Sequence, residues 1–189
     1  SFKNVVDKLI ETCFDSVGVF QELCMETCLA AKVYNTSQTE VEITQEHIEA
    51  AVEKKLNDYS SRHIRCLESF VEQKAKSSED TPLYMPYYFI KILLSENFEE
   101  VTKGLKRRSI QEKIKEIHHR PDDVRASDMG YFLQTLVTNQ IKKNISPPIF
   151  DFDISTSSVK IIDSTFYFFL KNCEKEEVME FIPMPDGTY

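Results

Sequence analysis

Hydrophobic residues recur at helical spacing along most of this chain. Val5, Leu9 and Cys13 repeat every four residues, which predicts a first helix that buries one of its faces. Ser16 and Ser127 precede two other such runs and are predicted to cap the helices that follow them. The chain is therefore predicted to be mainly α-helical, with helices over residues 2–13, 17–31, 44–73, 83–97, 107–119, 128–144 and 165–172.

The hydrophobic period changes at one place. Residues 149–154 and 159–162 form strand-like runs around the polar turn STSS, a pattern typical of a β-hairpin. Three helices followed by a hairpin is the layout of a winged-helix domain. The run AKSSEDTP, which ends in Pro82, is polar and without periodicity and is predicted to be a linker. These features predict a helical bundle over residues 1–80, a winged-helix domain over 81–172 and an acidic, extended tail over 173–189.

The composition is that of an ordinary soluble globular protein. The chain has 189 residues, of which 41% are hydrophobic and 29% charged. Its five cysteines are odd in number and lie mostly on apolar helical faces, which favours buried thiols over a disulfide framework. No leader peptide and no membrane-length apolar run are present, so we expect a cytoplasmic protein without a membrane partner. The first residues already follow a helical pattern, which is typical of a piece of a longer protein.

Positive charge is concentrated in the middle of an acidic chain. The net charge is −8, yet residues 81–148 carry 11 basic and 8 acidic side chains. A basic surface on a winged helix could contact DNA phosphates, although Asp122, Asp123 and Asp128 begin the presumed recognition helix and repel phosphate. DNA binding and protein packing therefore both stay open for this domain. The DNA-binding candidates are Lys106, Arg107, Arg108, Arg125, Lys142 and Lys143.

The sequence predicts no catalytic or metal site. The four glycines cannot supply a phosphate-binding loop, and the GKS or GKT of such a loop is absent. Cys24 and Cys28 lack a second cysteine pair, so buried thiols are favoured over zinc ligands. His118 and His119 end a helix, where cationic side chains suit the helix dipole. We therefore expect no enzymatic activity, no metal and no cofactor in this chain.

Two segments resemble the C-terminal part of an AAA+ or STAND-type ATPase, in which a helical lid precedes a winged helix. DSVGVFQELCMETC is similar to the lid segment near bound nucleotide, and VKIIDSTFYFFLKN to the end of the winged helix, with Asp163 and Phe166 at matching positions. The resemblance implies that Gly18 lets the lid helix start close to nucleotide. It places Gln21 where the family has an arginine that contacts the γ-phosphate, so Gly18 and Gln21 are the candidate nucleotide-sensing residues.

Three functions follow as hypotheses. The first is a non-catalytic region of an AAA+/STAND-like ATPase that docks on the nucleotide-binding core, or on another protein, and relays its state. The alternative is a winged-helix DNA-binding regulator whose N-terminal helices dimerise. A third is a purely helical adaptor for another protein.

Overall fold

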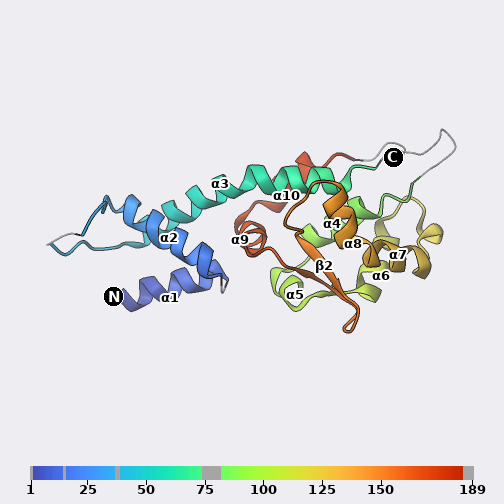
Figure 1. Ribbon diagram of the computed structural model, residues 1–189, viewed down its shortest axis with the longest axis horizontal. Helices are drawn as coiled ribbons and strands as arrows, with labels where there is room; N and C mark the ends of the chain where they lie inside the picture. The colour runs from blue at the N-terminus through green and yellow to red at the C-terminus, as the bar shows by residue number, and fades with distance from the viewer. Residues whose placement is uncertain (1, 15, 37–38, 74–81, 185–189) are drawn as a thin grey trace. The chain divides into compact units, whose positions relative to one another are not determined.

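The computed structural model describes residues 2–14, 16–36, 39–73 and 82–184, which are mainly helical with one small antiparallel sheet (Figure 1). This confirms the prediction that the chain is mainly α-helical and contains a β-hairpin. The chain divides into two compact units, unit 1 (residues 1–62 and 164–173) and unit 2 (residues 63–163 and 174–189). The predicted domains 1–80, 81–172 and 173–189 have other bounds than these units. The predicted linker, residues 75–82, lies outside the described residues except for Pro82.

Unit 1 is an all-helical bundle. It contains α1 (Phe2–Cys13), α2 (Val17–Ala30), the part of α3 (Gln45–Val71) up to Arg62, and α9 (Ser164–Asn172). The apolar spacing of these segments builds one core, because positions three or four apart share a helix face. The α9 residue Phe168 is fully buried in that core, although its segment follows the hairpin in the sequence. The other buried core residues are Leu9, Cys13, Val19, Leu23 and Ile48.

Unit 2 packs its helices around a group of phenylalanine rings. The rings of Phe70, Phe89 and Phe150 lie with centroids 5.3–6.2 Å apart, and tilted or edge-on ring packing of this kind is favourable. The helical elements are the end of α3, α4 (Met85–Ser95), α5 (Phe98–Lys103), α6 (Arg107–Ile117), the 3-10 turn η1 (Pro121–Asp123), α7 (Ala126–Gln134), α8 (Leu136–Lys142) and α10 (Lys175–Phe181).

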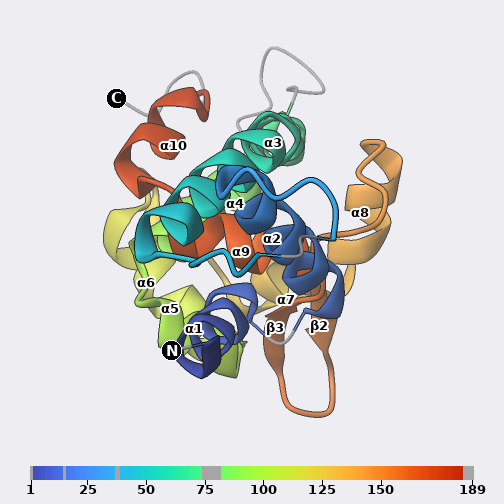
Figure 2. The ribbon, with the colours of Figure 1, turned by 90° about the vertical axis from the view of Figure 1, so that its left-hand side faces the viewer.

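The sheet of unit 2 has the order β1-β3-β2 and is antiparallel throughout. Strands β2 (Phe150–Asp153) and β3 (Ser158–Ile161) form the predicted hairpin, seen side by side in Figure 2. The two-residue strand β1 (Leu105–Lys106) pairs with β3, and Gly104 leads into it with φ of 89°. A Cβ atom at Gly104 would lie 3.3 Å from the Val159 carbonyl oxygen, so both the backbone angle and the close approach of β3 favour glycine there.

The segment predicted as one helix over 128–144 is two helices. Thr135 separates α7 from α8, and its hydroxyl donates to the carbonyl oxygen of Tyr131 at 2.8 Å. A threonine hydroxyl that bonds back to the preceding turn bends or interrupts a helix. The predicted cap is also displaced, since α7 begins at Ala126 with Arg125 in the N-cap position and Ser127 inside the helix.

The tail is predicted to be extended, but Lys175–Phe181 form helix α10, so that prediction is wrong for these residues. Val178 and Ile182, four residues apart, are both buried. The Lys175 ammonium donates to the Glu96 carbonyl oxygen at the end of α4 at 2.7 Å. Acidic residues in the first turn and this contact stabilise a helix that composition alone did not indicate.

Candidate functional site

The two candidate nucleotide-sensing residues, Gly18 and Gln21, lie exposed in the first two turns of α2. Ser16 caps this helix, as predicted, by accepting a hydrogen bond from the Val19 amide at 3.3 Å. A Cβ atom added at Gly18 would meet no heavy atom within 4 Å. Close packing inside unit 1 therefore does not require a glycine there, and both positions are open to a partner.

The Glu22 carboxylate, which follows Gln21 in the chain, is directed toward α3. The Lys55 ammonium lies 2.7 Å from it, and the Tyr59 hydroxyl donates to it at 2.6 Å. These hydrogen bonds lower the pKa of Glu22. Lys55 is itself buried and also pairs with Asp58 at 3.1 Å. The Lys55 ammonium is therefore paired with carboxylates inside unit 1. Helix α2 itself carries no Lys or Arg that could balance the negative charge of a phosphate group.

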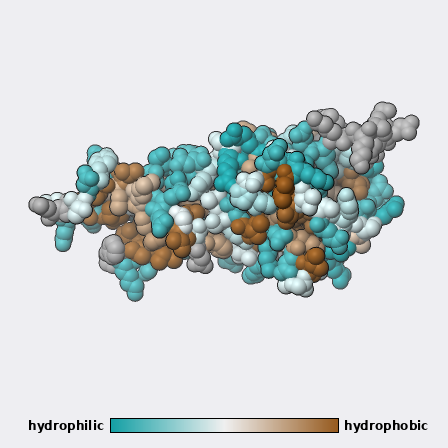
Figure 3. All heavy atoms as spheres, viewed as in Figure 1, coloured by the Kyte–Doolittle hydropathy of each residue, from teal (hydrophilic) through white to brown (hydrophobic). Residues whose placement is uncertain are grey.

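A small apolar hollow lies beside the start of α2. It has a volume of about 260 Å³ and is lined by Ile10, Cys13, Ser16, Val17 and Phe20. Val17 is 70% exposed and Ile10 45% exposed, which is high for such side chains. Figure 3 shows hydrophobic residues gathered on unit 1 around α2. This surface suits an apolar partner better than a phosphate group.

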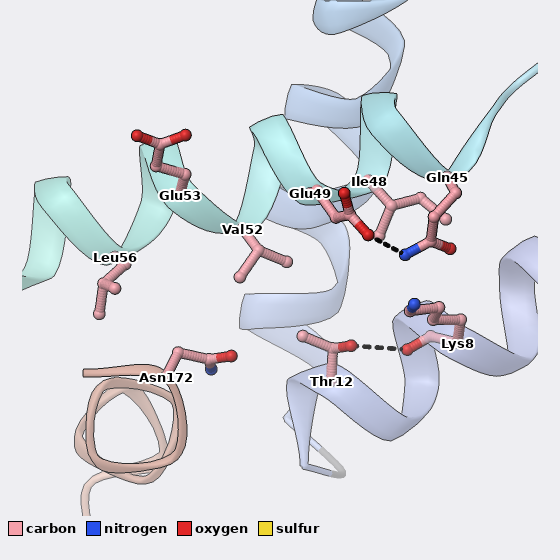
Figure 4. Close-up of a pocket in the computed structure, with 9 residues that line it drawn as sticks. All are labelled: Lys8, Thr12, Gln45, Ile48, Glu49, Val52, Glu53, Leu56 and Asn172. Carbon is pink, nitrogen blue, oxygen red and sulfur yellow. Dashed lines mark hydrogen bonds between the residues drawn. The ribbon is translucent and has the colours of Figure 1, made fainter. Parts of the chain in front are cut away.

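A second hollow, of about 330 Å³, lies between α1, α3 and α9 (Figure 4). Val52 and Leu56 point from α3 toward Asn172, whereas Glu53 points away from it. The Glu49 carboxylate accepts a hydrogen bond from the Gln45 amide at 2.7 Å. The lining contains no histidine or cysteine, and its two glutamates are not paired across the hollow. It is a shallow amphipathic groove lined by Lys8, Thr12, Gln45, Ile48, Glu49, Val52, Glu53, Leu56 and Asn172.

Lys143, a DNA-binding candidate, bonds to the end of α3. Its ammonium donates to the carbonyl oxygens of Ser69 at 3.0 Å and Phe70 at 2.8 Å, and also to that of Glu72. A cation at the last carbonyls of a helix satisfies acceptors that the helix cannot and interacts favourably with its dipole. Burial lowers the pKa of Lys143. This role is not visible in the sequence, because the carbonyls lie more than seventy residues earlier in the chain.

Three further candidates are also engaged within unit 2. Arg107 donates from its guanidinium to the Ala126 carbonyl oxygen at 2.7 Å, and a Cβ atom on Gly130 would lie 3.2 Å from the same group. Lys106 donates to the Thr156 carbonyl oxygen in the hairpin turn at 3.1 Å. Arg108 is exposed and pairs with Glu112 of the same helix at 2.8 Å. Arg107 and Lys106 thus join α6 to α7 and to the hairpin.

Arg125 and Lys142 are the DNA-binding candidates whose side chains are not engaged within the described part of unit 2. Among the residues that the structure describes, no hydrogen bond or ion pair involves either side chain, and both are exposed. Between Arg107 and α7 lies a polar hollow of about 370 Å³ that exposes Tyr131, Ser127 and Gln134. The structure therefore leaves α7 with an outward polar face but few uncommitted positive charges.

The hairpin turn is held by its acidic residue. One Asp153 carboxylate oxygen accepts from the Ser155 amide at 3.0 Å and from its hydroxyl at 2.5 Å, and the other lies 3.0 Å from the Lys160 ammonium. These contacts hold the pKa of Asp153 well below its usual range. The hairpin turn is thus self-contained, with an internal ion pair between Asp153 and Lys160.

The histidines at the end of α6 do not serve as cations at a helix terminus. His118 is buried; its Nδ1 accepts from the Arg120 amide at 2.8 Å, so its Nε2 donates to the Leu83 carbonyl oxygen at 2.8 Å. This pattern requires a neutral ring. His119 stacks on His118 and bonds to the Tyr88 hydroxyl.

Within the described residues, no three metal-binding side chains come together. Cys28 is an exposed thiol, although it was predicted to be buried.

Comparison with models of known protein families, with characterised proteins and with solved structures finds no match to this chain. None of the helices in the described ranges combines the length and the apolar composition of a membrane-spanning segment.

Proposed function

We propose that this chain is a non-catalytic protein-docking region of an AAA+/STAND-like ATPase, with unit 1 as a lid-like bundle and unit 2 as a winged helix. Helices α4, α6 and α7 followed by the β2–β3 hairpin support the winged-helix assignment, and pairing of β1 with the hairpin fits it. The bundle of α1, α2 and α3 supports the lid assignment. In this proposal the units transmit the state of a nucleotide-binding core by rigid-body motion. An ATPase of this kind would place the chain in the cytoplasm.

The observation that carries the docking role is how the basic side chains are used. Lys143 caps α3, Arg107 and Lys106 hold α6 to its neighbours, and Arg108 is paired with Glu112. Binding to DNA phosphates requires Lys and Arg side chains that are free to replace the counterions condensed on the DNA. The whole chain has a net charge of −8, and four of the six DNA-binding candidates are already bonded within unit 2, so unit 2 is better suited to contact a protein than a DNA backbone.

One observation favours the second candidate function, a winged-helix DNA-binding regulator. Arg125 and Lys142 are exposed, and α7 presents Ser127, Tyr131 and Gln134 on its outward face. Polar side chains on such a helix are suited to base edges in the major groove. DNA binding is therefore the role against which the docking proposal has to be tested.

The test has two arms. The reading frame that encodes this chain is sequenced upstream, and we expect a nucleotide-binding core with a phosphate loop before residue 1. That core is then titrated with the chain, with and without ATP, and the affinity is expected to differ between the two. A frame without such a core, or a core that the chain does not bind, would contradict the proposal.

The second arm measures DNA binding at two salt concentrations. Wild type is compared with Arg125→Glu/Lys142→Glu, which reverses the charges of the two uncommitted DNA-binding candidates, and with Lys54→Glu on α3 of unit 1 as a surface control. The docking proposal expects weak binding by all three proteins. Tight, steeply salt-dependent binding that only the double variant loses would establish the DNA-binding alternative instead.

A further inference from the structure

Helix α2 has no charged residue on its exposed side. Among its residues only Glu22 and Glu26 are charged. Glu26 is 8% exposed, and Glu22 pairs with the buried Lys55. A surface helix normally turns its charged residues to solvent, and a helix that lacks them on its outer face is usually covered. In α2 both carboxylates are directed away from that face.

The exposed face has the spacing of a helix-packing seam. Gly18, Gln21, Met25 and Cys28 are all exposed and follow one another at intervals of three, four and three residues. This alternation is the one that left-handed pairs of helices use. Met25 on this face is 54% exposed, and the flanking side chains Val17 and Leu29 are apolar and are 70% and 38% exposed. The face is therefore suited to another helix that lies nearly along α2.

The order of residues on this face is self-complementary. Position 23 is the midpoint of Gly18 and Cys28, of Gln21 and Met25, and of Val17 and Leu29. In a two-fold antiparallel pair, each residue meets its counterpart across that midpoint, and the same contact occurs twice. Gly18 would lie opposite the Cys28 side chain, and the space around its Cβ position is empty to 4 Å.

We propose that α2 pairs antiparallel with α2 of a second copy of this chain, with the two-fold axis at position 23. The absence of charge on the face favours a second copy, because each chain carries a net charge of −8 and like charges at the contact would oppose association. Leu23, at the midpoint, is fully buried in the core of unit 1, which fixes the outward side of the helix. The inference does not depend on the proposed docking role.

The size of the face sets the expected strength. A helix of 14 residues is about 21 Å long, and one side of it covers much less than the roughly 800 Å² per partner of a standard stable interface. The apolar hollow with Ile10 and Phe20 beside Val17 enlarges the contact. We therefore expect a reversible dimer that strengthens with protein concentration and with salt, since salt screens the repulsion between the two acidic chains.

The first experiment measures molecular mass by sedimentation velocity over a hundred-fold range of protein concentration. Wild type is compared with Met25→Glu, which places a charge on the face, and with Ala50→Glu, which adds the same charge at an exposed position of α3. Wild type and Ala50→Glu should dimerise alike, and Met25→Glu should weaken the dimer at least ten-fold while its circular dichroism stays unchanged. A wild type that is monomeric throughout, or a dimer that Met25→Glu leaves intact, overturns the proposal.

The second experiment tests the antiparallel register. Gly18→Cys is oxidised with diamide, which accepts the two hydrogens that a new disulfide releases. We expect a disulfide-linked dimer through Cys28 of the second copy, because opposed seam positions approach within disulfide distance. Gly18→Cys/Cys28→Ser should not form it. A dimer in solution whose Gly18→Cys variant crosslinks no better than wild type, or equally well without Cys28, overturns this register.

Discussion

The Gln140 side chain pairs with the main chain of Phe150 as a neighbouring strand would. Its Nε2 donates to the Phe150 carbonyl oxygen at 2.7 Å, and its Oε1 accepts from the Phe150 amide at 3.0 Å. The same Oε1 accepts from the Ile149 amide at 2.8 Å. Gln140 has no exposed surface, so this buried amide joins α8 to the first residue of β2.

Replacing Gln140 by Leu should lower the free energy of unfolding by about 2–4 kcal/mol, because buried backbone donors and an acceptor lose their partners. Gln134→Leu, at an exposed position of α7, is the matched control and should change it by less than about 0.5 kcal/mol. Urea unfolding followed by circular dichroism measures both. Equal stabilities of the two variants would contradict the role given to Gln140.

Adjacent lysines in α8 and at its end should differ sharply in their effect on stability. Lys143→Met removes the ammonium from the last carbonyls of α3 and should cost about 1–3 kcal/mol. Lys142→Met, one residue earlier and exposed, should cost less than about 0.5 kcal/mol. Thermal and urea unfolding of the pair give the comparison. If Lys143→Met proves as stable as Lys142→Met, the capping contact contributes nothing to stability.

Acidification should destabilise the chain through His119. Its amide donates to the Tyr88 hydroxyl at 3.3 Å, and the same hydroxyl lies 2.8 Å from Nδ1, to which it donates when that nitrogen carries no proton. Burial first, and then the neighbouring His118 and Arg120, lower the pKa of His119 below its ordinary value of 6.5, against an opposing effect of Asp123. The unfolded chain therefore binds the proton more tightly than the native one.

The stabilising effect is fully present above about pH 6.5 and is lost as the pH falls through the lowered native pKa. Urea unfolding between pH 7.5 and pH 5 should accordingly show falling stability in wild type. His119→Asn keeps an acceptor for Tyr88 but cannot titrate, so its stability should fall less over this window. Parallel curves for the two proteins would exclude His119 as the titrating group.

Shortening the buried aromatic of α9 should weaken unit 1. Phe168 is fully buried among the core residues and lies edge-on to Tyr59, with ring centroids 5.8 Å apart. Phe168→Ala should cost about 3–5 kcal/mol through lost burial and the cavity left behind. Tyr167→Ala, at the half-buried neighbour that packs on Phe14, should cost clearly less. A larger loss for Tyr167→Ala in urea unfolding would reverse the assignment of the core position.

The helices that the sequence predicted are those with a long, regular apolar repeat. Met85, Phe89 and Ile92 in α4 and Ile110 and Ile114 in α6 are buried as their spacing indicates. The elements it missed are short or depend on contacts made elsewhere. Strand β1 has two residues, too few for a period, and α5 has six.

The candidate site was predictable only where its chemistry is local. Ser16 caps α2 through residues next to it, so the sequence predicts it correctly. A cluster of basic residues in the sequence indicates possible DNA contacts. It does not reveal that Lys143 caps α3 or that Arg107 bonds to Ala126, because the fold brings both partners near. Nor does a hydrophobic pattern tell which side of an evenly apolar helix such as α2 faces outward.

The two glycines at positions 18 and 104 should behave oppositely in a population of variants. At Gly104 every other residue type meets a left-handed backbone and the Val159 carbonyl of the paired strand, so selection for folding alone should retain glycine. At Gly18, where nothing in the fold is close, the same selection should admit alanine and many larger side chains. If position 18 nevertheless stays small when self-association is selected instead, the constraint on it comes from a second molecule.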